Sequence, residues 1–268
     1  MPADLAFAHL ARAYVGVRGP GAADYLQRMV SNDVEALAAG GSCEAMLLTP
    51  KARVIAVVTV VRRADEDFLL VTEAGLGDLV REHLVRFRFA ARAEIEREEH
   101  EGAVVLGDFE PAEGVLAIPT RAYGVLAVEL VDGSAPDGAR AVGGDELELL
   151  RIRAGTVAAR DIDDRVLPAE AGLVERAVDF EKGCYPGQEP IARLHYRGHA
   201  NRGVRVLSLE GAEPPERDAE VVLRGKAVGR VTSAVRDNGR VVALAYVRAE
   251  VPADAVLQVG DAEARPLD

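Results

Sequence analysis

The stretch EKGCYPGQE, residues 181–189, contains Cys184, one of only two cysteines in the chain. Glycines on both sides of the thiol and a Pro-Gly step after it predict a turn, and a short helix is expected to begin at Gln188. Lys182 lies two residues before the thiol. A lysine and a helix N-terminus both favour the thiolate form of a nearby cysteine. The residues alone leave two interpretations open, a reactive sulfur and a buried turn cysteine.

Composition limits the classes of protein to consider. The chain has 268 residues and a net charge of −12, whereas general nucleic-acid binders are usually basic, so we expect no direct nucleic-acid partner. It lacks both an apolar run long enough to span a membrane and a recognisable signal peptide. Two cysteines do not form a disulfide framework, so we expect a cytoplasmic protein with free thiols, with Cys43 buried on a strand.

The first 200 residues predict a mixture of helices and strands. After a Gly-Pro-Gly turn, Leu26 and Met29 lie on one face of a helix that ends before Ser31. Two β-branched runs around residues 64–66 predict a hairpin, and residues 145–154 predict another helix. The segment GDLVREHLVRFRF predicts an amphipathic helix whose core face carries Leu79, Val80, His83, Leu84 and Phe87.

The character of the sequence changes after Asn201. Short strands follow one another without a helical pattern, and residues 237–239, Asp-Asn-Gly, are a strong hairpin signal. A run of such strands predicts a small β-barrel. We therefore expect an α+β body over residues 1–200 and a C-terminal β-barrel domain over 201–268.

The segment ARLHYRGHANRGVR, residues 192–205, is a basic island in an acidic chain. Arg193, Arg197 and Arg202 suit a ligand carboxylate or an acidic partner, because guanidinium groups bind carboxylates bidentately. The alternative is a solvated segment whose arginines pair with nearby acids. Two histidines of this segment lie near Cys184, but zinc fingers need a second close cysteine, so we predict no metal site.

The octapeptide KGCYPGQE closely resembles the signature K-G-C-Y-x-G-Q-E of the YgfZ-type folate-binding proteins, which are relatives of the glycine-cleavage T-protein, an aminomethyltransferase. The resemblance extends over most of the chain. It includes VRGPGAADYLQRMVSNDV and LLTPKARVIAVVTVVRR near the start, LPAEAGL before the octapeptide, and GRVTSAV in the barrel region.

This resemblance implies a three-part, ring-like fold around a central channel that binds tetrahydrofolate. Residues 45–145 would form an intervening subdomain within the body. The family acts in iron–sulfur cluster assembly or repair and, through it, in tRNA modification. Folate and iron–sulfur proteins are thus the expected partners of a monomeric protein. Lys182 and Cys184 carry over as its catalytic residues.

One departure from the related T-proteins concerns the pterin site. Their L-R-x-E-A-G motif carries a glutamate that binds the pterin, whereas LRIRAG here has Arg153 at that position. An arginine cannot accept the pterin's N–H bonds. We therefore expect Asp33 or Glu170 to contact the pterin, with the arginines of the basic island at the glutamate tail. Both acids could instead cap local turns.

The same departure bears on catalysis. It makes aminomethyl transfer in the T-protein manner doubtful, and whether the chain is an enzyme stays open. A folate-dependent aminomethyl- or methyltransferase is the alternative function. A pure interaction module with a vestigial folate pocket is a third possibility, which the sequence does not separate from the first.

Overall fold

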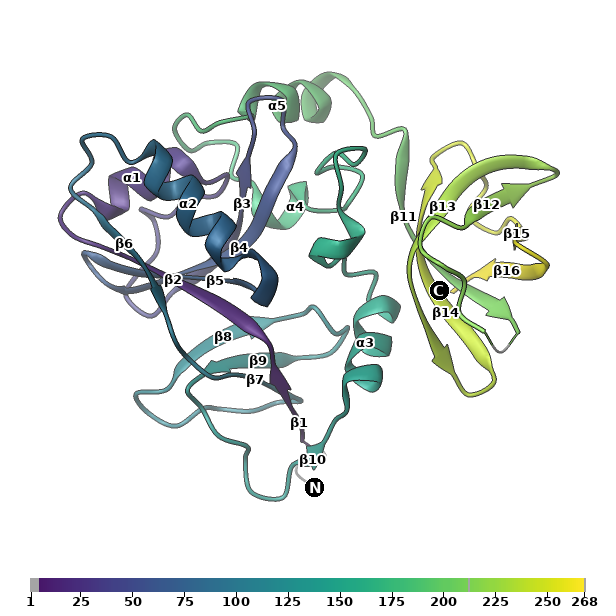
Figure 1. Ribbon diagram of the computed structural model, residues 1–268, viewed down its shortest axis with the longest axis horizontal. Helices are drawn as coiled ribbons and strands as arrows, with labels where there is room; N and C mark the ends of the chain where they lie inside the picture. Colours follow the sequence, from purple (N-terminus) through teal and green to yellow (C-terminus); the bar gives the residue numbers. More distant parts are fainter. Residues whose placement is uncertain (1–4, 212, 268) are drawn as a thin grey trace.

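The computed structural model describes residues 5–211 and 213–267 (Figure 1). Its strands are β1 (Ala6–Leu10), β2 (Arg12–Arg18), β3 (Ser42–Leu48), β4 (Val54–Ala64), β5 (Asp67–Glu73), β6 (Glu94–Glu98), β7 (Gly102–Leu106), β8 (Leu116–Thr120), β9 (Ala127–Val131), β10 (Arg140–Ala141), β11 (Arg202–Glu210), β12 (Glu220–Leu223), β13 (Lys226–Asp237), β14 (Arg240–Arg248), β15 (Leu257–Val259) and β16 (Ala262–Pro266).

These strands form two sheets and a barrel. The first sheet has the order β10-β1-β7-β9-β8, the second has the order β3-β4-β5-β2-β6, and the barrel closes as β11-β14-β13-β12-β15-β16. Figure 1 shows the two sheets on one side of the molecule and the barrel on the other. The predicted α+β class, with a C-terminal β-barrel, is confirmed.

The beginning of the chain contributes strands to both sheets. β1 pairs with β7 and β10, whereas β2, one residue further on, pairs with β5 and β6. β3 extends the second sheet by pairing with β4. Each sheet therefore combines early residues with strands from the middle of the chain. The predicted division into residues 1–200, with 45–145 as an intervening subdomain, and 201–268 stays a prediction.

Four helices were predicted and are present in that order, whereas the short α4 (Val174–Ala177) was not predicted. The other helices are α1 (Ala22–Met29), α2 (Gly77–Phe87), α3 (Gly144–Arg153) and α5 (Gln188–Arg197), with 3-10 turns η1 (Ala74–Leu76) and η2 (Ala159–Asp161). Side chains of α1 and α2 pack with the second sheet in one hydrophobic core. None of the described helices is long and apolar enough to cross a membrane.

The core face predicted for α2 is partly wrong. Val80 and Leu84 are completely buried, but Leu79 is 45% exposed and Phe87 is 39% exposed. Periodicity places these side chains on neighbouring positions of one broad stripe. The second sheet covers only half of that stripe, and the other half is left at the surface.

The barrel packs tightly against the rest of the chain through β14. All seven residues from Val241 to Val247 are buried. Alternate side chains of a strand point to opposite faces. Val241, Ala243, Ala245 and Val247 accordingly fill the barrel, while Val242, Leu244 and Tyr246 pack against residues of the body such as Ile152 and Leu173. One strand thus serves two hydrophobic cores.

His100 links the two sheets. Its Nδ1 lies 2.7 Å from a carboxylate oxygen of Asp132, just after β9, and its Nε2 lies 2.9 Å from Glu98 at the end of β6. Burial lowers the pKa of His100, but the hydrogen bonds to these two carboxylates outweigh it and raise the pKa above its ordinary value. The same contacts help to lower the pKa of Glu98 to about 2, after a larger contribution from Arg63.

We predict that this link stabilises the fold more in mild acid than in mild alkali. A group whose folded-state pKa is raised contributes stability that is complete below its unfolded pKa of about 6.5 and is lost as the pH rises through the folded value. Denaturant unfolding of the wild type and of His100→Gln should therefore differ more at pH 5.5 than at pH 8.5, by up to about 1 kcal/mol. An equal difference at both pH values would contradict this assignment.

Candidate functional site

Lys182 fastens the octapeptide to the end of α1. Its Nζ donates to the carbonyl oxygens of Gln27 (2.7 Å), Val30 (2.6 Å) and Asn32 (2.8 Å). Carbonyls at a helix C-terminus have no partner within the helix, and the helix dipole is negative there. Burial lowers the pKa of Lys182 to about 8, which still leaves the ammonium charged at neutral pH. All three of its N–H donors are therefore engaged.

The residues on either side of this lysine add further anchors. Upstream, Asp179 Oδ1 accepts the backbone N–H groups of Glu181 and Lys182. Downstream, Tyr185 is buried, and its ring centroid lies 5.3 Å from the Lys182 Nζ. Gly187 has a φ of +83°, and a Cβ there would lie 2.6 Å from the carbonyl oxygen of Thr49. Only glycine allows this approach.

Cys184 lies exposed between these anchored positions. Cys43, on β3, is half-buried, and its burial raises the pKa of its thiol to about 11, although the charge of Lys182 acts in the opposite direction. The lysine charge thus reaches Cys43, a neighbour that the sequence did not suggest. The catalytic roles of Lys182 and Cys184 stay predictions.

A central cavity of about 260 Å³ lies between the two sheets and the segment that follows α3. Strands β4 and β5 contribute apolar walls, and the charged side chains around it are Arg12, Glu44, Glu73, Glu129 and Arg176. Arg12 and Glu129 form an ion pair, and Glu73 accepts the backbone N–H of Ala159. Most of these charged groups therefore already have partners within the protein.

Glu44 and Glu73 in the central cavity each keep one carboxylate oxygen without a hydrogen bond from the described residues, and burial affects Glu44 in addition. One oxygen of Glu44 lies 3.2 Å from Arg176, while the other accepts no hydrogen bond from the described residues. Burial raises the pKa of Glu44, which means that its charge is poorly compensated. A ligand that donates N–H groups would stabilise the charged form.

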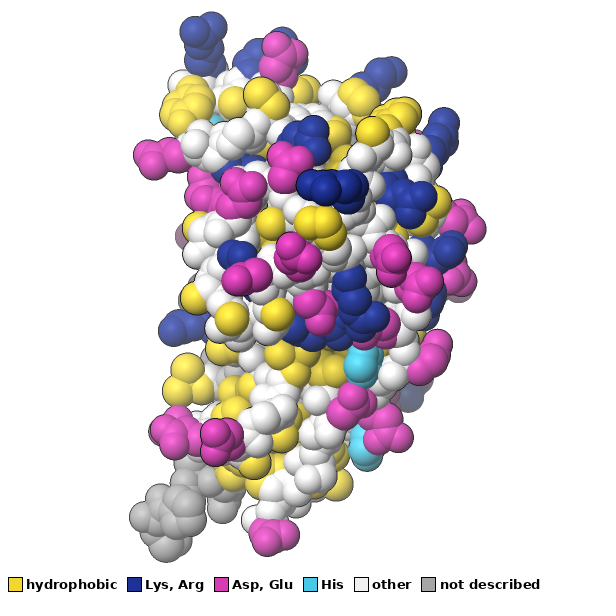
Figure 2. All heavy atoms as spheres, turned by 90° about the vertical axis from the view of Figure 1, so that its left-hand side faces the viewer, with side chains coloured by type: hydrophobic (Ala, Val, Ile, Leu, Met, Phe, Trp, Pro, Cys, Tyr) yellow, Lys and Arg dark blue, Asp and Glu magenta, His cyan; other side chains and the backbone are white. Residues whose placement is uncertain are grey.

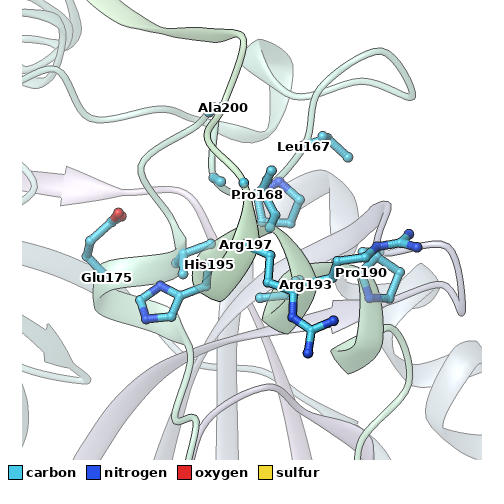
Figure 3. A pocket seen from close by; sticks show the side chains of 14 residues that line it. Leu167, Pro168, Glu175, Pro190, Arg193, His195, Arg197 and Ala200 are labelled. Carbon is cyan, nitrogen blue, oxygen red and sulfur yellow. The ribbon is translucent and has the colours of Figure 1, made fainter.

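A second cavity, of about 490 Å³, lies beside α5 (Figure 3). Its walls are mostly apolar, and its polar lining comes from Glu175 together with Arg193, His195 and Arg197. Neither arginine forms an ion pair with any residue that the structure describes. Adjacent residues of α4, Glu175 and Arg176, line this α5 cavity and the central cavity respectively, so the two cavities flank one short helix.

The other predicted ligand residues make contacts within the protein. Asp33 Oδ1 accepts from the Gln27 side chain and from the backbone N–H of Ala36, which is the turn-capping alternative. Glu170 is 4% exposed, accepts the backbone N–H of Leu167, and pairs with Arg202 at 3.1 Å. Neither acid is among the described residues that line the two cavities. Their pterin contacts stay a prediction.

Arg153 does not enter either cavity. Its side chain is 47% exposed and forms an ion pair with Asp237 at the end of β13. The described residues contain no cluster of His, Cys, Asp or Glu side chains that could hold a metal ion.

Comparisons with known proteins find a domain family and relatives that match this chain. Residues 8–105 match the family model described as the GCVT N-terminal domain. The chain is 28% identical to the tRNA-modifying protein YgfZ of Edwardsiella ictaluri, with 92% of this chain and 85% of that one covered. It is 25% identical to the mitochondrial iron-sulfur cluster assembly factor IBA57 homolog of Pyricularia oryzae, with 92% and 72% covered.

The structural comparison covers nearly the whole chain. The crystal structure of the glycine cleavage system aminomethyltransferase T from Bartonella henselae superimposes with a TM-score of 0.83, over 99% of this chain and 85% of that one, at 20% identity. The molecule thus has the fold of the glycine-cleavage T-protein superfamily. The resemblance to the YgfZ-type proteins that the octapeptide indicated is confirmed.

We predict that Lys182→Met lowers the free energy of unfolding by about 2 kcal/mol, because three carbonyls lose a charged donor. Lys226→Met, at an exposed position of the barrel, is the matched control and should change stability by less than about 0.5 kcal/mol. Urea unfolding of both variants measures the difference. Equal midpoints for the two variants would show that the ammonium contributes nothing.

The two thiols should react at very different rates. At pH 7.5 we expect iodoacetamide to label Cys184 at least about tenfold faster than Cys43, whose thiolate is scarce at that pH because of its raised pKa. Mass spectrometry of the folded protein, with Cys43→Ala and Cys184→Ala as single-thiol references, measures each rate. Similar rates for both thiols would contradict the exposed position of Cys184 and the partial burial of Cys43.

Proposed function

We propose that this chain is a folate-binding accessory protein that serves iron–sulfur cluster assembly or repair and, through it, tRNA modification. The observation that carries the proposal is the exposed thiol of Cys184, held between the engaged Lys182 and the buried Tyr185 within the octapeptide. The names of the two relatives, one a tRNA-modifying protein and the other a cluster assembly factor, support it.

The geometry of the octapeptide suits a transient role for the thiol. Anchors on both sides fix the position of the sulfur, and exposure leaves it open to a partner. A thiolate is a soft ligand suited to iron, but one cysteine does not hold a cluster alone. The partner protein would therefore supply the remaining ligands, and a folded, cytoplasmic monomer is the form we propose for this chain.

The charged groups of the two cavities suit tetrahydrofolate. This molecule joins a pterin with several N–H donors to a tail that ends in carboxylates. Glu44 offers a carboxylate oxygen without a donor from the described residues, and Arg193 and Arg197 offer guanidinium groups without ion pairs. Ligand pockets usually measure about 300–1,000 Å³. The central cavity, at about 260 Å³, has room for a ring head and leaves the tail to lie outside it.

We therefore propose Glu44 and Arg176 of the central cavity as the pterin contacts, in place of Asp33 and Glu170, and Arg193 and Arg197 beside α5 as the contacts of the tail carboxylates. When bound, tetrahydrofolate supplies a carrier for one-carbon units. The protein residues bind and orient it: the carboxylate accepts ring N–H groups, and the apolar strand faces exclude water.

The alternative function, aminomethyl transfer in the T-protein manner, has weaker support. The family model that matches is shared with the T-protein, but Arg153 replaces the pterin-binding glutamate and its side chain pairs with Asp237 in the barrel. We propose the accessory role because the thiol motif is present and this glutamate is absent.

Calorimetric titration with 5-formyltetrahydrofolate should give a micromolar dissociation constant, about −8 kcal/mol. Glu44→Gln should weaken binding at least tenfold, and Glu110→Gln, an exposed control, should not. The double variant Arg193→Ala, Arg197→Ala should weaken binding of the folate but not of a tetrahydropterin without the glutamate tail. If Asp33→Ala or Glu170→Ala abolishes binding while Glu44→Gln does not, the pterin lies elsewhere.

The accessory role is tested in a host that lacks its own copy of the gene. Cys184→Ala should lose the activity of iron–sulfur enzymes almost completely, while folate affinity and the unfolding midpoint stay within error of the wild type. Cys43→Ala is the matched control and should restore activity. Full restoration by Cys184→Ala would reduce the octapeptide to a structural turn.

A further inference from the structure

The exposed side chains of α2, which include Leu79 and Phe87, continue into the loop of residues 88–93 that joins α2 to β6. Leu79, His83 and Phe87 lie four residues apart along one side of the helix, and the rings of His83 and Phe87 are 4.9 Å apart. Phe89, two residues beyond, is 85% exposed. Single exposed apolar residues are common, but a contiguous series is typical of an interaction site.

The backbone at Phe89 is also strained. Its φ is +44°, in the left-handed region that favours glycine. Because the ring is exposed, its burial does not offset the cost of this backbone conformation in the isolated chain. Strain retained at an exposed position is a feature of functional surfaces.

The loop carries an unbalanced positive charge. Residues 83–93 read HLVRFRFAARA and contain three arginines and no acid, in a chain of net charge −12. Arg86 lies over the ring of Phe87 at 5.6 Å, and Arg88 donates to the carbonyl of Ala93. Among the described residues, Arg86, Arg88 and Arg92 have no ion-pair partner. Most other arginines of the sheets and barrel are paired.

Hollows lie on both sides of these arginines. One, of about 510 Å³, has an apolar floor that includes Tyr25 and Met29 of α1, and the other measures about 420 Å³. Arg88 and Arg92 line both. The loop joins α2 to β6 in Figure 1, and Figure 2 shows hydrophobic, basic and acidic side chains together at the top of the face.

We propose that this surface, formed by Leu79, Phe87, Phe89 and the arginines at 86, 88 and 92, docks an acidic segment of a partner protein. The partner's carboxylates would pair with the arginines, and an apolar anchor residue would enter the hollow beside Met29. Phenylalanine and arginine are enriched at the cores of protein interfaces. The surface is separate from both cavities, so the proposal does not depend on folate binding.

The surroundings favour a short acidic segment over a nucleic acid or an anionic membrane. Glu82 lies one turn before Arg86 on α2, Glu94 lines the smaller hollow, and Asp24 lines the larger hollow. These acids confine the positive charge to one loop. An extended polyanion would meet them, whereas a short peptide fits between them.

The test uses fluorescence anisotropy with the full chain and a short fluorescein-labelled peptide that has Asp and Glu around a central Phe. We expect saturable binding that weakens as salt rises. Phe89→Gly should weaken it at least tenfold without lowering the thermal midpoint, because glycine relieves the backbone strain. The double variant Arg88→Glu, Arg92→Glu should weaken it further. Leu126→Ala, at another exposed apolar position, should leave it unchanged.

Three outcomes would overturn the proposal. The first is equal binding of a peptide with Gln and Asn in place of its acids. The second is tighter binding of single-stranded RNA or phosphatidylserine vesicles, with the same loss in the variants. The third is an acidic peptide that fails to bind, or that binds the Phe89→Gly protein as well as the wild type.

Discussion

A single ammonium group joins distant parts of the chain. Lys182 donates to three carbonyls near the end of α1, some 150 residues earlier in the sequence. Beside it, Ser31 donates to the carbonyl of Ala177 and accepts the backbone N–H of Met46. These bonds fix where the octapeptide begins. The positions of Cys184, of the turn at Gly187 and of α5 all follow from that starting point, since the chain between them is short and tightly anchored.

The two cavities depend on the same region. α4 is only one turn long, yet its adjacent residues Glu175 and Arg176 line different cavities. Successive residues of a helix point about 100° apart, so one turn suffices to divide a space in two. α5, which borders the larger cavity, starts at Gln188, within the octapeptide. The thiol and the α5 cavity are thus built on one continuous stretch of chain, whereas the central cavity depends on both sheets.

Local patterns predicted local structure well. The hairpin at residues 237–239 joins β13 to β14, and the helix expected after Gly187 is α5. The sequence could not show which groups meet across long separations. Nothing near Lys182 indicates that its partners are the carbonyls of Gln27 and Val30, and nothing near Glu44 indicates Arg176. Periodicity likewise marked Leu79 and Phe87 as apolar, but the width of the covering sheet decides whether such residues are buried.

The two-sided burial of β14 has a consequence for how the protein can be divided in the laboratory. Val242, Leu244 and Tyr246 face Ile152 and Leu173, while their neighbours in sequence fill the barrel. A shortened chain that ends before β11 would expose the apolar surface of the body that β14 normally covers. An isolated barrel would expose the side chains of Val242, Leu244 and Tyr246. Amide protons of β14 are therefore expected to be among the slowest to exchange with solvent, because releasing them requires both cores to open together.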